Sequence, residues 1–306
     1  MTHVLVAGAT GFLGVAVRAC LEASGTQVTA IDVRNAPGIF HVDICATDQL
    51  DRILSTGTVP DAIVHLAAAG KGEEGLVAGA EIDPAGAVRT NIGGFVQVAE
   101  AAARHGVGRV VWSSSTTVYG RASDYSEPVG ESAPLRPTTT YGATKAACEH
   151  LGPILARELG IEIVSLRLPM VYGPGRWYGG SQAPLVELAN ALQEGRTTEI
   201  EAWEGEADWV HVSDAATALL ALLKLQNPHP AYHVLGHRGS FTQLARELVR
   251  AAHGVSTITI RTAKAGAPDL PSIDDSLLRQ DTGWYPRFAD AESGAADYLS
   301  QSIRPT

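Results

Sequence analysis

The first 32 residues follow a pattern that few folds accommodate. A short apolar segment, residues 3–7, runs into the stretch GATGFLG at 8–14, and a second apolar segment, 27–31, ends at Asp32. We expect a strand, a tight turn, a helix and a second strand, with an acid about 20 residues beyond the turn. This arrangement binds a dinucleotide, because the glycines let the backbone approach a pyrophosphate at the helix N-terminus. The glycines of the turn are Gly8, Gly11 and Gly14.

Asp32 distinguishes the two nicotinamide dinucleotides. Its carboxylate can accept hydrogen bonds from the adenosine ribose hydroxyls and repels a ribose 2'-phosphate, so the sequence favours NAD. Arg34, two residues later, could pair with that phosphate, so NADP remains the less favoured alternative.

Apolar segments and helical patterns alternate from the first strand to Leu168. The segment 62–66 is another buried strand, and it ends in the small residues Ala67 and Ala68. Asp43-Ile44 closes an intervening strand and could border the adenine. This alternation predicts an α/β fold with a doubly wound, mainly parallel, Rossmann-like sheet.

The rest of the chain suggests a second, smaller unit. We expect the Rossmann-like domain to hold residues 1–168, with a returning element at about 213–236 that contains a strongly apolar helix. A smaller α/β substrate lobe would take 169–212 and 237–306, with Trp203 and Trp209 in its core.

Hydroxyl side chains gather where the strand 109–112 ends, in the run SSSTT at 113–117. They lie at the carboxyl edge of the predicted sheet, where ligands of such folds bind. Tyr141 and Lys145 are four residues apart in a helix that reaches about Leu159, so they share one face. We expect the Lys145 ammonium to lower the pKa of the Tyr141 phenol and make it an acid/base near neutral pH.

These features occur together in a known group of enzymes. The glycine turn, Asp32, the strand end His65-Leu66-Ala67-Ala68, Asn91, the segment 113–120 and the pair Tyr141-x-x-x-Lys145 resemble, in order, the extended short-chain dehydrogenase/reductases. The chain is most similar to the NAD-dependent epimerase/dehydratase family, whose best-known member is UDP-glucose 4-epimerase. The resemblance covers almost the whole chain.

The resemblance implies roles for individual residues. Ser115 would be the catalytic hydroxyl, Tyr141 the acid/base, and Lys145 the residue that tunes the tyrosine and holds the nicotinamide ribose. The residues implied in cofactor binding are Gly8, Gly11, Phe12, Leu13, Gly14, Asp32, Arg34, Asp43, Ile44, Leu66, Ala67, Ala68, Asn91, Ser113, Tyr141, Lys145, Pro169 and Val171. Those implied in substrate binding are Lys71, Ser115, Thr116, Tyr141, Met170 and Arg176. A homodimer that pairs through the helices beginning near Asn91 and Tyr141 is implied as well.

Departures from the family pattern narrow the set of reactions and substrates that the chain is expected to use. Members that eliminate water carry an acidic pair just after the catalytic hydroxyl, where this chain has Thr116 and Thr117, so an elimination is not expected. Met170 replaces an asparagine that contacts the substrate in sugar-nucleotide enzymes. Ala207, beside Glu206, replaces an arginine that binds the nucleotide phosphates. Because charge-assisted bonds to phosphate are strong, these replacements argue against a UDP- or dTDP-sugar.

Other cations could still bind an anionic substrate. Arg176, just after Gly173-Pro174-Gly175, is the first candidate. The alternative is that Arg176 binds no substrate and is a solvated loop cation. Further candidates are Lys71, Arg89 and Arg238.

The sequence therefore favours an NAD-dependent oxidoreductase that transfers hydride between NAD and the secondary alcohol or carbonyl of a small, non-nucleotide, sugar-like substrate. A sugar 4-epimerase of the same family, with the nucleotide held by other residues, is the alternative. A third hypothesis is a dinucleotide-sensing protein, against which the intact Ser115, Tyr141 and Lys145 argue.

Composition excludes other partners. The formal charge is −10, which argues against nucleic acid, and no apolar run approaches the roughly 18 residues that span a membrane. Three scattered cysteines without CxxC spacing suggest reduced thiols and a cytoplasmic location. His229, His233 and His237 lie on a loop and a strand, so their spacing does not predict a metal site.

Overall fold

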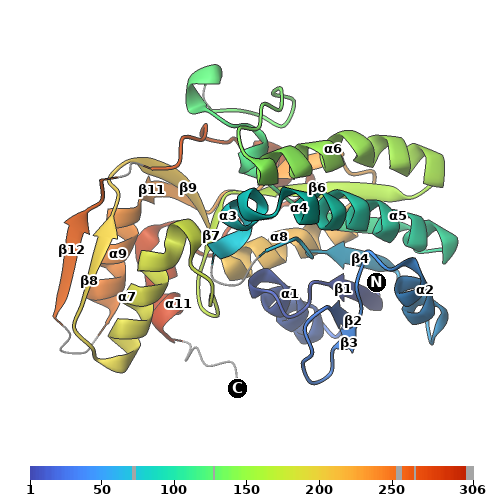
Figure 1. Cartoon of the computed structure of the whole chain (residues 1–306), viewed down its shortest axis with the longest axis horizontal. Coiled ribbons are helices and arrows are strands. Elements are labelled where there is room, and N and C mark those ends of the chain that lie inside the picture. The colour runs from blue at the N-terminus through green and yellow to red at the C-terminus, as the bar shows by residue number, and fades with distance from the viewer. Residues whose placement is uncertain (71–73, 127, 253–256, 265–266, 301–306) are drawn as a thin grey trace.

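The computed structural model describes residues 1–300 except 71–73, 127, 253–256 and 265–266. It has two lobes that lie side by side, the smaller on the left in Figure 1. The larger lobe is built on a seven-stranded sheet in which every neighbouring pair of strands is parallel. Its strands, in spatial order, are β10 (Ala231–His233), β6 (Glu162–Leu168), β5 (Arg109–Ser115), β4 (Ala62–His65), β1 (His3–Ala7), β2 (Gln27–Asp32) and β3 (Phe40–His41).

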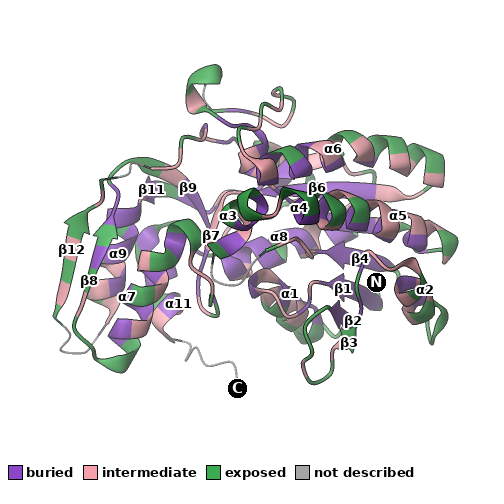
Figure 2. Ribbon diagram, viewed as in Figure 1, coloured by how far each residue is buried: buried purple, intermediate pink, exposed green. Residues whose placement is uncertain are grey.

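Helices cover both faces of this sheet, which confirms the doubly wound α/β fold. α1 (Phe12–Ala23) and α8 (Val212–Lys224) pack together on one face, and α2 (Thr47–Ser55), α5 (Gly94–Arg104) and α6 (Thr140–Leu159) pack on the other. The central strands β1 and β4 are buried along their whole length (Figure 2). Burial on both faces explains why these strands read as continuous apolar runs in the sequence.

The helix that leads into α5 begins earlier than the sequence suggests. We expected it to start near Asn91, but α4 (Pro84–Ala87) and a π-helical turn (Val88–Gly93) run directly into α5. The side chain of Asp83 accepts a hydrogen bond from Gly86 N and caps this start, and Pro84 occupies the first turn. Asp-Pro is a standard helix start signal, and the apolar periodicity that begins later in the sequence conceals it.

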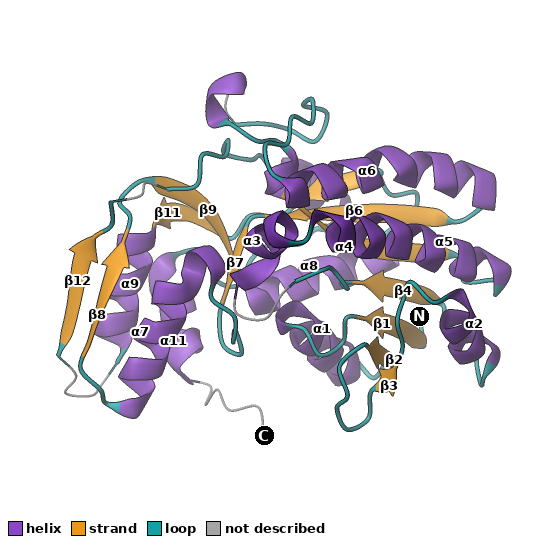
Figure 3. Cartoon of the chain, in the orientation of Figure 1, coloured by secondary structure: helices purple, strands orange, loops and turns teal. Residues whose placement is uncertain are grey.

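The smaller lobe combines two short sheets with three helices (Figure 3). One sheet has the order β11–β9–β7, and the other pairs β12 with β8. Trp203 and Trp209 stack in its core with ring centroids 5.8 Å apart, as expected. The elements are β7 (Met170–Tyr172), α7 (Ala183–Glu194), β8 (Thr198–Ala202), β9 (Glu206–His211), β11 (His237–Ser240), α9 (Phe241–Ala251), β12 (Ile258–Thr262) and α11 (Ala291–Ser300).

The chain passes between the lobes with little linker. β6 continues into β7 with Pro169 as the sole intervening residue, and β9 ends at the residue before α8 begins. One segment differs from the division inferred from sequence. α10 (Ser276–Thr282) was assigned to the smaller lobe, but Leu278 and Trp284 pack in the core beneath the large sheet, beside α8.

Within the described residues, no helix combines the length and apolar character needed to cross a bilayer.

Candidate active site

The turn between β1 and α1 is shaped so that side chains are excluded. Gly8 has φ +83°, and a Cβ there would lie 2.7 Å from the backbone nitrogen of Ala67. A Cβ on Gly14 would lie 2.1 Å from the Gly8 carbonyl oxygen. Gly11 is the N-cap of α1 and has no side chain to cap its first N–H groups. The turn therefore offers close backbone approach and a helix N-terminus, which fit a pyrophosphate.

Asp32 lies beside this turn and is 8% exposed. Its carboxylate accepts hydrogen bonds from Thr10 N (2.9 Å), Thr10 Oγ1 (2.7 Å) and Arg34 N (3.0 Å). The Arg34 guanidinium stacks 4.9 Å above the ring of Trp177, which comes from the smaller lobe. The acid is thus fixed in place at the end of β2, where an adenosine ribose would meet it.

Asn91, expected at the cofactor site, bonds to two neighbouring segments of the chain. It is 3% exposed, and its Oδ1 accepts from Ala69 N (2.7 Å) while its Nδ2 donates to Thr144 Oγ1 (2.9 Å). Thr144 in turn donates to the carbonyl of Tyr141 (2.8 Å). Asn91 therefore joins the loop after β4 to the first turns of α6 and positions both.

The other expected cofactor residues lie on five segments around the same edge of the large sheet. Phe12 and Leu13 begin α1, and Asp43 is exposed next to the buried Ile44. The remaining ones are Leu66, Ala67 and Ala68 after β4, Ser113 on β5, and Pro169 and Val171 around β7.

The three serines at the end of β5 have three separate uses. The carbonyl of Ser113 accepts a hydrogen bond from Lys145 Nζ (2.8 Å). Ser114 Oγ donates to Glu149 (2.5 Å), whose carboxylate also pairs with the buried Arg167. Ser115 Oγ accepts from Thr117 N (3.2 Å) and Thr117 Oγ1 (3.0 Å). Ser113 and Ser114 thus tie β5 to α6, and Ser115 remains half-buried at the strand end.

A close backbone approach brings α6 against this strand end. A Cβ on Gly142 would lie 2.4 Å from the carbonyl oxygen of Thr117, in the 3-10 turn that follows Ser115. The first turn of α6 is capped by Thr139, which accepts from Gly142 N (3.1 Å), and by Glu81, which accepts from Thr140 N (2.7 Å). Gly142 is a site residue that sequence analysis missed, because its requirement depends on a partner 25 residues away.

Tyr141 and Lys145 are both buried, and burial dominates their electrostatics. The Lys145 Nζ lies 5.6 Å from the centroid of the Tyr141 ring and 5.3 Å from that of Trp112. Burial lowers the pKa of Lys145 to about 8. Burial also raises the pKa of Tyr141 well above its ordinary value, and Tyr178 and Cys148 add to the rise. The expected lowering of the tyrosine pKa by the lysine is therefore wrong for the protein alone, and the phenol stays protonated at neutral pH.

The two arginines expected near the substrate differ in what they contact. Arg176 is 8% exposed, so it is not a solvated loop cation; its guanidinium donates to the Val171 carbonyl (3.1 Å) and stacks 4.2 Å from the centroid of the Tyr178 ring. Arg238 is paired with Glu206 (3.1 Å) and Asp208 (3.0 Å). Lys71 lies outside the described residues.

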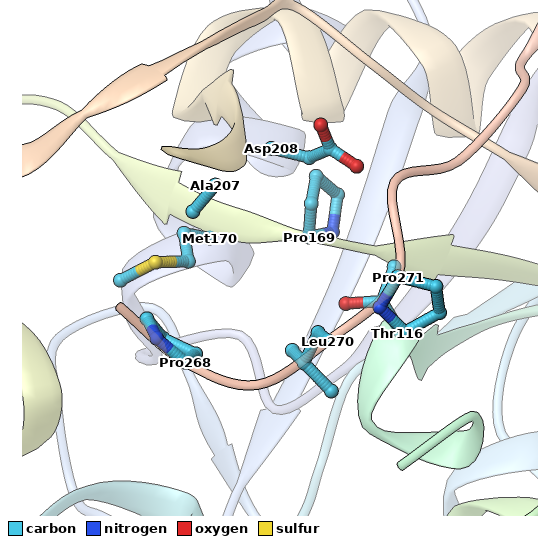
Figure 4. Close-up of a pocket in the computed structure, with 8 residues that line it drawn as sticks. All are labelled: Thr116, Pro169, Met170, Ala207, Asp208, Pro268, Leu270 and Pro271. Atoms are coloured by element: carbon cyan, nitrogen blue, oxygen red, sulfur yellow. The ribbon is translucent and has the colours of Figure 1, made fainter. Parts of the chain in front are cut away.

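A pocket lies where the large sheet meets the smaller lobe (Figure 4). It begins at Thr116, next to Ser115, and reaches Met170 and Ala207, the positions where sequence analysis found replacements. The full lining is Thr116, Pro169, Met170, Ala207, Asp208, Pro268, Leu270 and Pro271. The loop segment 268–271 was not among the expected site residues, because no motif in it points to a ligand.

Among the residues that the structure describes, no three His, Cys, Asp or Glu side chains gather in a way that could hold a metal ion. His233 Nδ1 bonds to the carbonyl of Asp274 (2.8 Å), and His237 Nε2 to Tyr172 Oη (3.2 Å). Both histidines are buried polar groups of the protein interior.

The comparisons with known proteins agree with this geometry. Residues 4–236 match the model of the NAD dependent epimerase/dehydratase family. The chain is 31% identical to a dTDP-glucose 4,6-dehydratase of Streptomyces niveus over 95% of this chain and 90% of that protein. It superposes on the UDP-glucose 4-epimerase of Thermus thermophilus in complex with NAD, with TM-score 0.81, 24% identity and 98% of each chain covered. It also superposes on the L-threonine dehydrogenase of Phytophthora infestans, with TM-score 0.82, 25% identity and 98% of each chain covered.

The parallel sheet, the glycine turn with Asp32 and the buried Tyr141–Lys145 pair beside the end of β5 define an enzyme of the extended short-chain dehydrogenase/reductase class. The chain belongs to the NAD dependent epimerase/dehydratase family. Members of this family are NAD-dependent enzymes, so the sequence-based expectation of an NAD-dependent oxidoreductase is confirmed at this level.

Proposed function

We propose that this enzyme transfers a hydride between NAD and the secondary alcohol or carbonyl of a small, sugar-like substrate that carries no nucleotide. The pocket beside Ser115 carries this proposal. Met170 and Ala207 line it, and Arg238, the cation on the neighbouring strand, is already paired with Glu206 and Asp208. A nucleotide diphosphate would lose its hydration there without gaining charged donors.

The proposed chemistry uses three side chains. The glycine turn and Asp32 would hold NAD, which would supply the acceptor for the hydride of the carbinol carbon. Ser115 positions the substrate oxygen by a hydrogen bond, and Tyr141, as phenolate, removes the hydroxyl proton; in the reverse direction its phenol supplies that proton. Lys145 holds the strand end through Ser113 and places a positive charge near the phenol ring. That charge favours the phenolate when Tyr141 must lose its proton.

NAD is proposed rather than NADP because of Asp32. Its carboxylate is fixed at the end of β2 by Thr10 and would repel a 2'-phosphate. Arg34, the residue that could bind such a phosphate, is stacked on Trp177 and lies 3.9 Å from Asp32. We further propose a cytoplasmic location, which the three unpaired cysteines support.

The alternative is a 4-epimerase, in which the ketone is retained and reduced again from its other face. Two measurements on purified protein separate the possibilities. Reduced-nicotinamide absorbance is followed with NAD or NADH and a panel of free sugars, sugar acids, aldehydes and UDP-sugars, and each mixture is analysed for isomerised product. Net cofactor turnover with a free compound supports the proposal. An isomerised UDP-sugar without net cofactor change rejects it in favour of the epimerase, and NADH binding without any reaction would favour a sensing protein.

Tyr141→Phe tests the assigned acid/base. We expect kcat/KM to fall about a hundredfold or more, because proton transfer by a positioned side chain contributes about that much. NADH binding, followed by nicotinamide fluorescence, should persist. The matched control is Tyr285→Phe, at a tyrosine that is 68% exposed, and it should leave turnover unchanged. Unchanged turnover in Tyr141→Phe would remove this residue from the mechanism.

A further inference from the structure

The pocket beside Ser115 is assembled from four segments that are far apart in the sequence. Pro169 and Met170 come from the junction of β6 and β7, and Ala207 comes from β9. The segment 268–271 runs along one side of the pocket in Figure 4. Thr116 completes the lining at the end nearest Ser115. A group bound here would therefore lie next to the reacting carbon of the proposed reaction.

The segment 268–271 is held in place from several sides. Asp269 Oδ1 accepts a hydrogen bond from Ala122 N (3.0 Å), and Leu270 N donates to the Pro268 carbonyl (2.9 Å). Just beyond it, Val129 N donates to the Ser272 carbonyl (2.8 Å). The ring of Pro271 further restricts the backbone. This segment thus forms a fixed apolar wall whose side chains select what can bind.

Six of the eight lining residues are apolar, and Asp208 is one of the two polar ones. Its Oδ1 accepts from Arg238 (3.0 Å) and its Oδ2 from Ile273 N (2.9 Å), so both oxygens already have donors. A substrate hydroxyl in this pocket would lose water and meet mainly carbon atoms. The cavity is also small, about 20 Å³, which is little more than one water requires.

We propose that the pocket binds a short aliphatic group next to the carbinol carbon, so that the substrate is a small secondary alcohol or ketone with an alkyl substituent rather than a polyhydroxylated sugar. This inference rests on the proposed hydride transfer with NAD, and it puts an alkyl-substituted alcohol or ketone in place of the sugar-like substrate named there. Leu270 and Met170 supply the apolar surface that the alkyl group contacts, and Pro268 and Pro271 limit its length.

Isosteric ketones test this directly. Butan-2-one and hydroxyacetone have the same number of heavy atoms and differ by a methyl group in place of a hydroxyl. Pentan-3-one and dihydroxyacetone also have equal numbers of heavy atoms and differ by two methyl groups in place of two hydroxyls. NADH oxidation is measured with each. We expect kcat/KM to be about ten- to a hundredfold higher for the alkyl member of each pair, the range by which an apolar pocket rejects an added hydroxyl.

Leu270→Asn provides a second readout, because it places an amide in the apolar wall. The alkyl-to-hydroxyl ratio of kcat/KM should fall about tenfold or more in this variant. Val59→Asn makes the same kind of change at a residue that is 43% exposed, at the opposite edge of the large sheet, and it should leave the ratio unaltered.

The outcomes separate this inference from the function on which it rests. A ratio of one or below in the native enzyme, or no reduction of the alkyl ketones, overturns the aliphatic pocket. If NADH is then oxidised by hydroxylated compounds, the oxidoreductase proposal stands. Isomerisation of a UDP-sugar without net NADH change would remove both.

Discussion

At the scale of single residues, the burial of Lys145 is the least expected feature of the site. The residue is 3% exposed, and its Nζ donates to a backbone carbonyl, that of Ser113. A charged ammonium costs free energy in this position, because burial removes it from water. This cost lowers the pKa of Lys145 to about 8. His65, also buried nearby, has its pKa lowered to about 3 by burial and by the Lys145 charge. The site therefore keeps one cation and a neutral imidazole in the same buried region.

This burial predicts a pH dependence of stability. The pKa of Lys145 is about 8 in the folded chain and near the ordinary 10.5 in the unfolded chain, so between these values the unfolded chain holds a proton that the folded chain has lost. The free energy of unfolding should then rise with pH, by about 2 kcal/mol from pH 7.5 to 9.5. Urea unfolding of the native protein and of Lys145→Met checks this. The rise should be present in the native protein and smaller by about that amount in the variant; equal slopes would contradict it.

Single-residue roles could be predicted where they depend on spacing, and not where they depend on packing. The four-residue interval places Tyr141 and Lys145 on one helix face, and the structure confirms that they lie close together. The direction of the tyrosine pKa could not be predicted, because it depends on how deeply α6 is buried. The same holds for the hydrogen bonds of the Asn91 amide to Ala69 and Thr144, which depend on how the loop after β4 packs against α6.

At the scale of elements, the position of α6 decides how Tyr141 lies relative to the end of β5, where Ser115 stands. The glycine at 142 lets the helix touch the turn after β5, and Thr139 and Glu81 fix where the helix begins. The carboxylate of Glu149, one turn beyond Lys145, bonds to Ser114 and Arg167 and so holds the helix against both β5 and β6.

Gly142→Ala should therefore impair catalysis through the placement of a whole helix. The added methyl would lie 2.4 Å from the Thr117 carbonyl, so α6 or the turn must shift. We expect kcat to fall about ten- to a hundredfold, since a displacement of about 1 Å between reacting groups costs that much. Gly152→Ala, on the same helix, is the control, because its methyl would lie 3.6 Å from Ile163 Cγ2, an ordinary contact. Equal activity in the two variants would show that the close approach is unimportant.

Elements with strong periodicity or turn signals could be predicted closely, including β2, α6 and the apolar α8. The continuous helical run from Pro84 to Arg104 could not, because its first half is held by the Asp83 cap and by packing rather than by an apolar face. The segment 268–271 has no regular structure, and its role as a pocket wall depends on tertiary contacts that no local pattern encodes.

At the scale of the whole molecule, we expect two copies to pair through α5 and α6. Ala99, Ala102 and Ala146 on these helices are buried against the chain's own core and do not form this surface. The outward apolar side chains in this region include Ile154, which is 43% exposed, and Val88, which is 49% exposed.

Ile154→Glu tests the expected dimer. A charge at this position would be desolvated in a paired state, so the native protein should elute at twice the chain mass and the variant at the chain mass. Light scattering after size-exclusion chromatography measures both. Val15→Glu, at an exposed position of α1 on the other face of the sheet, should leave the dimer intact. A native protein at the chain mass would reject the dimer outright.

The passage from β6 to β7 through Pro169 has a consequence for cooperativity. A hinge requires residues whose backbone angles are free to change, but here the strand of one lobe becomes the strand of the other across a proline whose φ is fixed. The return from β9 to α8 has no intervening residue at all. Unfolding of the sheet in one lobe should therefore disrupt the strand that continues into the other lobe. We expect the two lobes to unfold in a single cooperative transition. A molecule bound at their junction would then raise the stability of the entire chain.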